Sequence, residues 1–142
     1  MKRGVTMDNI LKLLQELTTE EKAALVSGTD FMYTNPVPRL NIPSIRMSDG
    51  PHGLRVQKEG GDNGVAGSEP ATAFPTAVST ASGWNPDNTY KMGEAIAEEA
   101  LHYGVNVLLG PGVCIKRNPL CGRNFEYFSE DPLLAGKMGA AE

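Results

Sequence analysis

The sequence contains no long apolar run and no long basic run. No apolar stretch approaches the roughly 18 residues of a membrane-spanning helix, and no run of Lys and Arg exceeds two residues. A membrane span and a nucleic-acid-binding surface are therefore not expected. Lys2 and Arg3 are not followed by the apolar stretch of a signal peptide. These absences predict a cytoplasmic protein.

Cysteine and histidine are scarce. The chain has two cysteines, Cys114 and Cys121, and two histidines, His52 and His102. Their number and spacing match neither a disulfide framework nor a metal site, so no bound metal is expected. Because disulfides are rare in a reducing compartment, we expect the cysteines to be buried or partly buried free thiols.

Several motifs of common enzyme classes are also missing. A Gly-Pro-Gly sequence at 110–112 follows an apolar stretch, but the chain has neither a GxGxxG nor a P-loop pattern. It also lacks the GxSxG and HExxH motifs of serine hydrolases and zinc peptidases. The absence of the GxGxxG and P-loop patterns argues against nucleotide binding.

The composition itself is that of a globular protein with many shaped loops. Of 142 residues, 40% are hydrophobic and 21% charged, with a net charge of −4. This balance is typical of a single folded domain and not of a disordered chain. Sixteen glycines and ten prolines indicate loops of defined conformation.

Two helices are predicted near the N-terminus. Residues 8–17 place apolar side chains on one helical face, which gives an N-terminal helix within residues 1–18. Thr18 and Glu21 form a capping-box pattern for a second helix, which Gly28 is placed to end. The apolar face of the first helix consists of Ile10, Leu13, Leu14 and Leu17.

Two further helices are predicted in the second half. Asn85 is a favourable N-cap and Pro86 occupies the first helical position, with Gly104 at the end. Asp131 and Pro132 repeat this pattern for a last helix. No C-cap follows, which predicts a chain truncated at 142 within this element. The apolar stripe of the third helix is Met92, Ile96, Ala100 and Tyr103.

Short strands are predicted at residues 45–48, 76–80 and 105–112. The last is almost continuously apolar, as buried parallel strands are. The alternation of strands and helices predicts βα units on a parallel sheet, and therefore an α/β fold. Charged loops follow the strand ends, where α/β proteins build their sites.

Asp49 is the first candidate site residue. It follows a predicted strand and precedes Gly50 and Pro51, so its carboxylate would lie on a rigid turn and accept hydrogen bonds from ligand hydroxyls. The alternative is an ordinary Asp-Gly turn. Arg55 lies six residues further on, beyond a second glycine, and is either a donor to the same ligand or a surface arginine.

Arg123 is the second candidate, in the charged and aromatic segment 117–132. Its guanidinium offers five donors in a planar fork, which suits adjacent sugar hydroxyls or a carboxylate. The alternative is a structural pair with Glu126, three residues later. Three aromatics in this segment are more often loop anchors than a sugar-stacking surface, and we expect His52 and Trp84 to have no chemical role. The aromatics are Phe125, Tyr127 and Phe128.

Taken together, these segments resemble glycoside hydrolase family 3, in particular its β-glucosidases. The matching stretches are EEKAALVSG (20–28), SDGPHGLR (48–55), ATAFPTA (71–77) and the long block GVNVLLGPGVCIKRNPLCGRNFEYFSEDPLLAGKMGAA (104–141). They cover most of the chain in the family's order, and the last block is too long and unusual to arise by chance.

The resemblance implies a fold and roles for the candidate residues. The fold is a (β/α)8 barrel of the TIM type, of which this chain supplies roughly the first half. Asp49 matches the aspartate that holds the hydroxyls of the terminal glucose, and Arg55 and Arg123 match arginines of the same subsite. Glu126 matches a residue that holds Arg123.

The resemblance also implies that the catalytic groups lie elsewhere. A retaining glycosidase uses two carboxylates, a nucleophile and an acid/base. The family's Ser-Asp-Trp-like nucleophile motif and its Lys-His pair are absent from this chain. We therefore expect residues 1–142 to be a partial N-terminal barrel domain that is inactive and poorly stable alone, its partner being the missing C-terminal remainder.

The intact enzyme is expected to remove terminal β-D-glucosyl residues from small β-glucosides or oligosaccharides. It would do so through a covalent glycosyl-enzyme, without metal or organic cofactor. The residues leave open a preference for xylosides. The alternative function is a non-catalytic sugar-binding module, or a decayed enzyme, that uses Asp49, Arg55 and Arg123 without chemistry.

Overall fold

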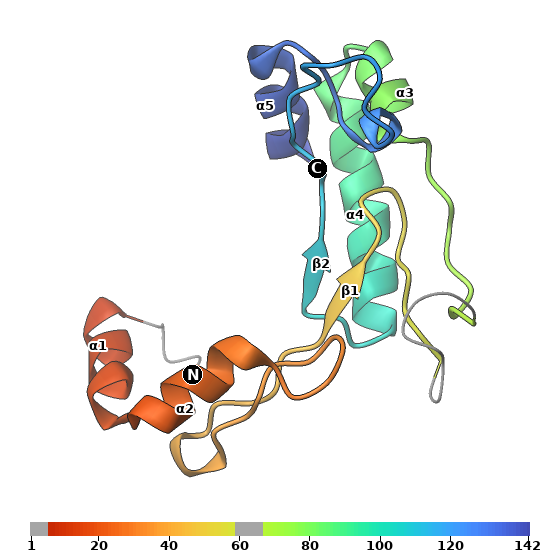
Figure 1. The fold of residues 1–142 in the computed structure, drawn as a ribbon. Coiled ribbons are helices and arrows are strands. Elements are labelled where there is room, and N and C mark those ends of the chain that lie inside the picture. The colour runs from red at the N-terminus through yellow and green to blue at the C-terminus, as the bar shows by residue number, and fades with distance from the viewer. Residues whose placement is uncertain (1–5, 59–66) are drawn as a thin grey trace. The chain divides into compact units, whose positions relative to one another are not determined.

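The computed structural model describes residues 6–58 and 67–142. The chain divides into two compact units, Met1–Arg46 and Met47–Glu142. Figure 1 shows helices in both units and the strands β1 and β2 in the second. The content of helices and strands is that of the predicted α/β class.

The N-terminal unit contains α1 (Met7–Glu16), α2 (Thr19–Ser27) and the 3-10 helix η1 (Pro38–Leu40). The predicted capping box is confirmed, because Thr18 and Glu21 exchange side-chain and backbone hydrogen bonds at the start of α2. Gly28 ends this helix with a φ of 75°. Both predicted N-terminal helices are therefore present.

Two side chains of the N-terminal unit hydrogen-bond to α2. The amide of Asn35 donates to the carbonyl oxygens of Ala24 (2.9 Å) and Gly28 (2.7 Å), which lie at the end of α2. Arg39 donates from Nε to Glu21 (2.6 Å), and this bond lowers the pKa of the Glu21 carboxyl to about 2. Because the pair is exposed, it contributes little to stability.

The second unit contains a parallel pair of strands joined through helices. Met47 of β1 lies opposite Val107 of β2, and Asp49 lies opposite Leu109. Parallel neighbours require a crossover connection, which α3 and α4 supply here. The elements are β1 (Met47–Asp49), α3 (Ala77–Ser82), α4 (Pro86–His102), β2 (Val107–Leu109), η2 (Asn124–Glu126) and α5 (Pro132–Ala141).

Helix α4 covers this pair of strands, and Figure 1 shows it running alongside them. Its predicted N-cap is confirmed, since the Asn85 side chain accepts a hydrogen bond from the Asp87 amide (3.0 Å). Met92 and Ile96 of the predicted stripe are buried. The core cluster around them is Leu54, Val56, Met92, Ile96 and Val105, with Phe74, Ala100, Tyr103 and Leu108 packed against it.

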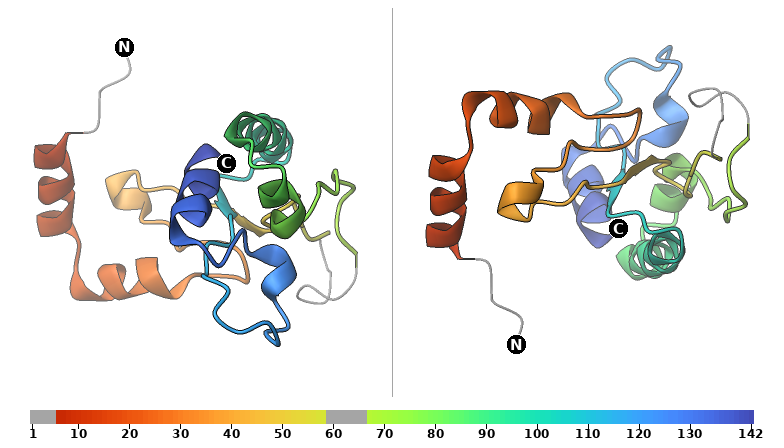
Figure 2. Two further views of the ribbon diagram at one scale, coloured as in Figure 1. Left: turned by 90° about the horizontal axis from the view of Figure 1, so that it is seen from above. Right: turned by 90° about the horizontal axis from the view of Figure 1, so that it is seen from below.

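Helix α5 packs beside α4, as the views in Figure 2 show. Its predicted cap is confirmed by the hydrogen bond from the Leu133 amide to Asp131 (2.9 Å). The Thr89 hydroxyl and the Met138 sulfur, both fully buried, lie 3.4 Å apart in this contact. The second core cluster is Ala77, Ala81, Phe128, Ala135 and Met138.

The prediction of a strand at residues 76–80 is wrong, because this segment begins helix α3. Ala77 and Ala81 lie one helical turn apart and are both buried in the second core cluster. The hydroxyls of Thr80 and Ser82 donate to carbonyls four residues earlier, at Thr76 (3.2 Å) and Val78 (2.7 Å). Packing of the small residues has overridden the β preference of the threonines and the valine.

The strands differ from their predictions in length and burial. β1 begins two residues later than predicted, and only Val107–Leu109 of the 105–112 segment is a strand. The sequence predicts a buried strand here, yet Val107 is 41% and Leu109 46% exposed. Within the described residues the sheet consists of β1 and β2 alone, so no strand lies across from β2 to pack against these side chains.

The thiols also differ from expectation. Cys114 and Cys121 are free, as predicted, but both are exposed and not buried. They lie in the loop between β2 and η2, outside both core clusters. In residues 6–58 and 67–142, every helix is too short or too polar to cross a membrane.

Candidate functional site

The four residues predicted from the sequence line one cavity in the second unit. This cavity, called the Asp49 cavity below, has a volume of about 380 Å³ and begins where β1 ends. It is formed by loop 49–55, by residues 68–73 and by the segment around η2. Its walls are Asp49, Gly50, Pro51, His52, Gly53, Leu54, Arg55, Ser68, Ala71, Thr72, Ala73, Arg123, Phe125 and Glu126.

Loop 49–55 folds back on itself through two glycines. Gly50 has a φ of 105° and Gly53 a φ of 144°, conformations that side chains rarely adopt. A Cβ at Gly50 would lie 1.7 Å from the Gly53 carbonyl oxygen. The Arg55 amide then donates to the Asp49 carbonyl (3.1 Å). The fold of the loop thus brings Arg55 next to Asp49, and both residues are exposed.

The second wall, residues 117–128, is a series of turns. The Asn118 side chain accepts from the Leu120 amide (2.9 Å), and the Asn124 side chain donates to the Asn118 carbonyl (2.9 Å). Phe128 anchors the end of the segment in the second core cluster. This segment therefore has a defined conformation despite its lack of regular helical or strand periodicity.

Arg123 and Glu126 form an ion pair in this wall. Nε of Arg123 donates to Oε1 of Glu126, and this hydrogen bond raises the pKa of the guanidinium. The Glu126 side chain is only 12% exposed, whereas that of Arg123 is 73% exposed. Because the bond uses Nε, the two Nη groups, which bond to nothing within the described residues, stay available to a ligand. Arg123 can therefore pair with Glu126 and bind a ligand at the same time.

His52 and Phe125 also line the cavity, although the sequence predicts no chemical role for either. Their rings meet edge to face, with centroids 6.1 Å apart and an interplanar angle of 73°. Phe125 is 49% exposed, so it is not a core anchor, unlike Phe128 at 3%. The sequence offers one signal for a role of these two residues, since each lies within three residues of a predicted site residue. Trp84 lies outside the cavity and is 73% exposed.

No cluster of metal-ligating side chains is found in the described part of the chain. The chemistry of the Asp49 cavity is instead that of a carboxylate, guanidinium groups and an imidazole beside an aromatic ring. Such a set can both donate and accept hydrogen bonds and offers an apolar ring face to a ligand.

Comparison with known families identifies this arrangement. Residues 39–142, which include every wall of the Asp49 cavity, match the model of the glycosyl hydrolase family 3 N-terminal domain. The chain belongs to this family. The match extends well beyond half of the chain, and the resemblance found in the sequence is thereby confirmed.

Relatives in family 3 include enzymes with two different names. The thermostable beta-glucosidase B of Acetivibrio thermocellus is 52% identical over 134 residues, which cover 94% of this chain and 18% of that protein. An exo-alpha-(1->6)-L-arabinopyranosidase of Bifidobacterium longum is 52% identical over 125 residues, which cover 87% of this chain and 16% of that protein. The chain therefore spans less than a fifth of the length of these relatives.

A solved family 3 structure supports the observed fold. The beta-glucosidase of Kluyveromyces marxianus in complex with glucose superposes with a TM-score of 0.83 at 39% identity. The superposition covers 93% of this chain and 15% of that one.

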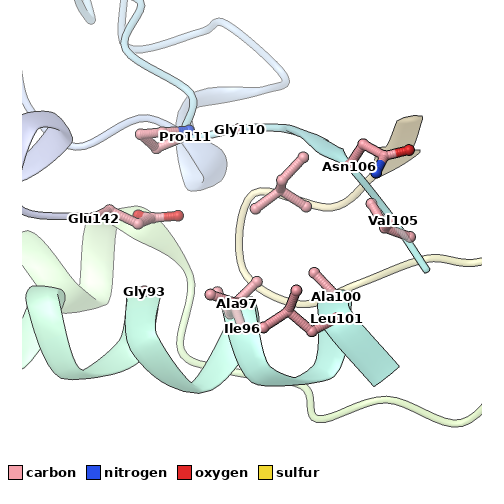
Figure 3. Close-up of a pocket in the computed structure, with 11 residues that line it drawn as sticks. Gly93, Ile96, Ala97, Ala100, Leu101, Val105, Asn106, Gly110, Pro111 and Glu142 are labelled. Atoms are coloured by element: carbon pink, nitrogen blue, oxygen red, sulfur yellow. The ribbon is translucent and has the colours of Figure 1, made fainter. Parts of the chain in front are cut away.

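The family 3 domain has a second cavity of about 450 Å³, shown in Figure 3. Its lining is mostly apolar and comes from α4, from β2 with its flanking residues, and from the end of α5. Glu142 is its only acidic residue, and burial raises the pKa of that carboxyl to about 7. None of the predicted site residues lies here, and the cavity offers no second polar group for hydroxyl chemistry beyond Asn106.

Proposed function

We propose that residues 1–142 are the N-terminal part of the (β/α)8 barrel domain of a retaining β-glucosidase. In this proposal the chain supplies part of the sugar-binding subsite, and the bond-breaking carboxylates come from other parts of the enzyme. The observation that carries it is the convergence of Asp49, Arg55 and Arg123 on one cavity in a family 3 chain.

Each of these residues has a role that fits its geometry. The Asp49 carboxylate accepts hydrogen bonds from adjacent sugar hydroxyls, and it is held by a loop that cannot relax easily. Arg123 donates from its Nη groups while Glu126 fixes its Nε. Charge-assisted hydrogen bonds of this kind are stronger than neutral ones and orient a pyranose ring for reaction.

The carboxylates that break the bond are not assigned to this chain. Retaining glycosidases need a nucleophile and an acid/base about 5–5.5 Å apart on opposite sides of the glycosidic bond. Asp49 is assigned to hydroxyl binding, and Glu126 is occupied by Arg123. We therefore do not assign either of them as the nucleophile.

The barrel proposal is supported by the strands of the second unit. β1, the helical crossover and β2 form one parallel βαβ unit, the repeating element of a (β/α)8 barrel. The half-exposed Val107 and Leu109 on β2 are suited to packing in the interior of a larger barrel. A complete barrel has about 250 residues, so this chain would contribute about half.

A second candidate substrate is an α-L-arabinopyranoside. It is favoured by the identity of 52% to the arabinopyranosidase, which equals that to the β-glucosidase. The two sugars differ in the substituent at C5 and in the configuration at C4. The same cavity would hold either sugar through its shared hydroxyls.

The proposal predicts different activities for two proteins. The protein expressed from the complete gene should hydrolyse a p-nitrophenyl β-D-glucoside or α-L-arabinopyranoside, whereas purified residues 1–142 should give no turnover above the buffer rate. Release of p-nitrophenol measures both. Turnover by residues 1–142 that is lost on Asp49→Ala would contradict the proposal, and sugar binding without hydrolysis by the complete protein would favour a non-catalytic module.

A further inference from the structure

The backbone of His52 is held firmly at the edge of the Asp49 cavity. Its carbonyl accepts a hydrogen bond from the Phe74 amide (2.9 Å). The next residue, Gly53, is packed so closely that a Cβ would lie 2.3 Å from the Thr72 carbonyl oxygen. His52 therefore has little freedom to move relative to residues 72–74.

The two ring nitrogens of His52 have different surroundings. Nδ1 is buried and has no hydrogen-bond partner in residues 6–58 and 67–142, whereas Nε2 is not one of the buried atoms that lack a partner there. In a neutral imidazole one nitrogen carries the proton and the other a lone pair. A buried N–H without an acceptor costs the free energy of a lost hydrogen bond, so this environment favours the tautomer with the proton on Nε2.

The neighbours of His52 define what this N–H faces. The Phe125 ring packs edge to face against the imidazole and limits its rotation. Asp49 and Arg123 line the same cavity and supply an acceptor and donors for hydroxyl groups. An N–H donor beside an aromatic ring gives the cavity one polar group that can fix a ligand's orientation and one apolar surface for it to contact.

We propose that His52 is a hydroxyl-binding residue, donating from Nε2–H to one hydroxyl of the bound pyranoside. The inference rests on the proposed function and assigns to His52 a part in selecting the sugar. Loss of this donor removes one hydrogen bond from both the bound substrate and the transition state.

Three variants of the protein from the complete gene test this assignment. His52→Phe keeps the ring and its packing on Phe125 but removes the donor, and kcat/KM for the preferred p-nitrophenyl glycoside should fall about fivefold to tenfold. His52→Gln places an amide N–H near the position of Nε2 and should stay within about twofold of wild type. His52→Asn, whose amide mimics Nδ1 instead, should resemble His52→Phe.

A panel of monodeoxy glycosides separates binding from a structural role. For the sugar that lacks the contacted hydroxyl, wild type and His52→Phe should have equal kcat/KM. An equal loss by His52→Phe on every sugar, or no loss on any, would overturn the assignment.

If the complete wild-type protein hydrolyses none of the glycosides, the proposed function fails too. If it is active and Asp49→Ala is not, while His52→Phe equals wild type, only the His52 proposal fails.

Discussion

Replacing Asp49 with alanine in the protein from the complete gene should lower kcat/KM for its preferred glycoside about a hundredfold to a thousandfold. The Asp49 carboxylate lines the Asp49 cavity at the end of β1. The backbone carbonyl of the same residue accepts a hydrogen bond from the Arg55 amide. Two charge-assisted hydrogen bonds to hydroxyls, each near the lower end of about 1.5–3 kcal/mol, contribute about 3–4 kcal/mol together, and each 1.36 kcal/mol corresponds to about tenfold in rate.

Asp8→Ala is the matched control for this substitution. Asp8 is an exposed aspartate on α1, outside the cavity, so its loss should leave kcat/KM within about twofold of wild type, as is usual for surface changes. A kcat/KM for Asp49→Ala equal to that of Asp8→Ala would contradict the role assigned to Asp49. Thermal unfolding of both variants shows whether a loss of activity reflects a loss of fold.

Gly50→Ala should be the most disruptive single-methyl change in the cavity. The added Cβ would overlap the Gly53 carbonyl oxygen at 1.7 Å, a backbone atom that no side-chain rotation can move away. The φ of 105° adds a strain of about 1–3 kcal/mol for a non-glycine residue. Loop 49–55 must then open, which separates Arg55 from Asp49. We expect a clear fall in Tm and a loss of kcat/KM of at least about a hundredfold.

Gly136→Ala serves as the control for this second prediction. Gly136 lies in α5, and a methyl group added there would have nothing within 4 Å. Alanine is favoured over glycine in a helix by about 1 kcal/mol. This variant should keep its activity and unfold at the same or a slightly higher temperature. If Gly50→Ala behaved in the same way, the folded-back loop would not be needed to position the site.

The helices that begin with a polar cap could be predicted because their ends depend on local chemistry. A capping side chain accepts a hydrogen bond from a backbone N–H that the start of a helix leaves unpaired. Three such caps are confirmed, at Thr18, Asn85 and Asp131. The segment at 76–80 has no such polar cap, since the Thr76 side chain makes no capping bond. Its helix depends on the packing of Ala77 and Ala81 against residues more than 45 positions later, which local patterns do not contain.

The candidate site was predictable only in part. Asp49, Arg55 and Arg123 can be found from their residue types, their loops and the resemblance to family 3, and the cavity brings them together. The contribution of His52 and Phe125 depends on the contact between their rings, which joins loops more than 70 residues apart. Sequence spacing carries no information on such a contact, so the sequence predicts no chemical role for either residue.

The location of the covalent intermediate tests the central claim most directly. The protein from the complete gene is treated with a 2-deoxy-2-fluoro glycoside that traps the glycosyl-enzyme, digested, and the labelled peptide sequenced by mass spectrometry. The account predicts one labelled carboxylate outside residues 1–142, and slower labelling in Asp49→Ala. A label on Asp49, Glu126 or any other residue of 1–142, or no label on an active enzyme, would contradict it.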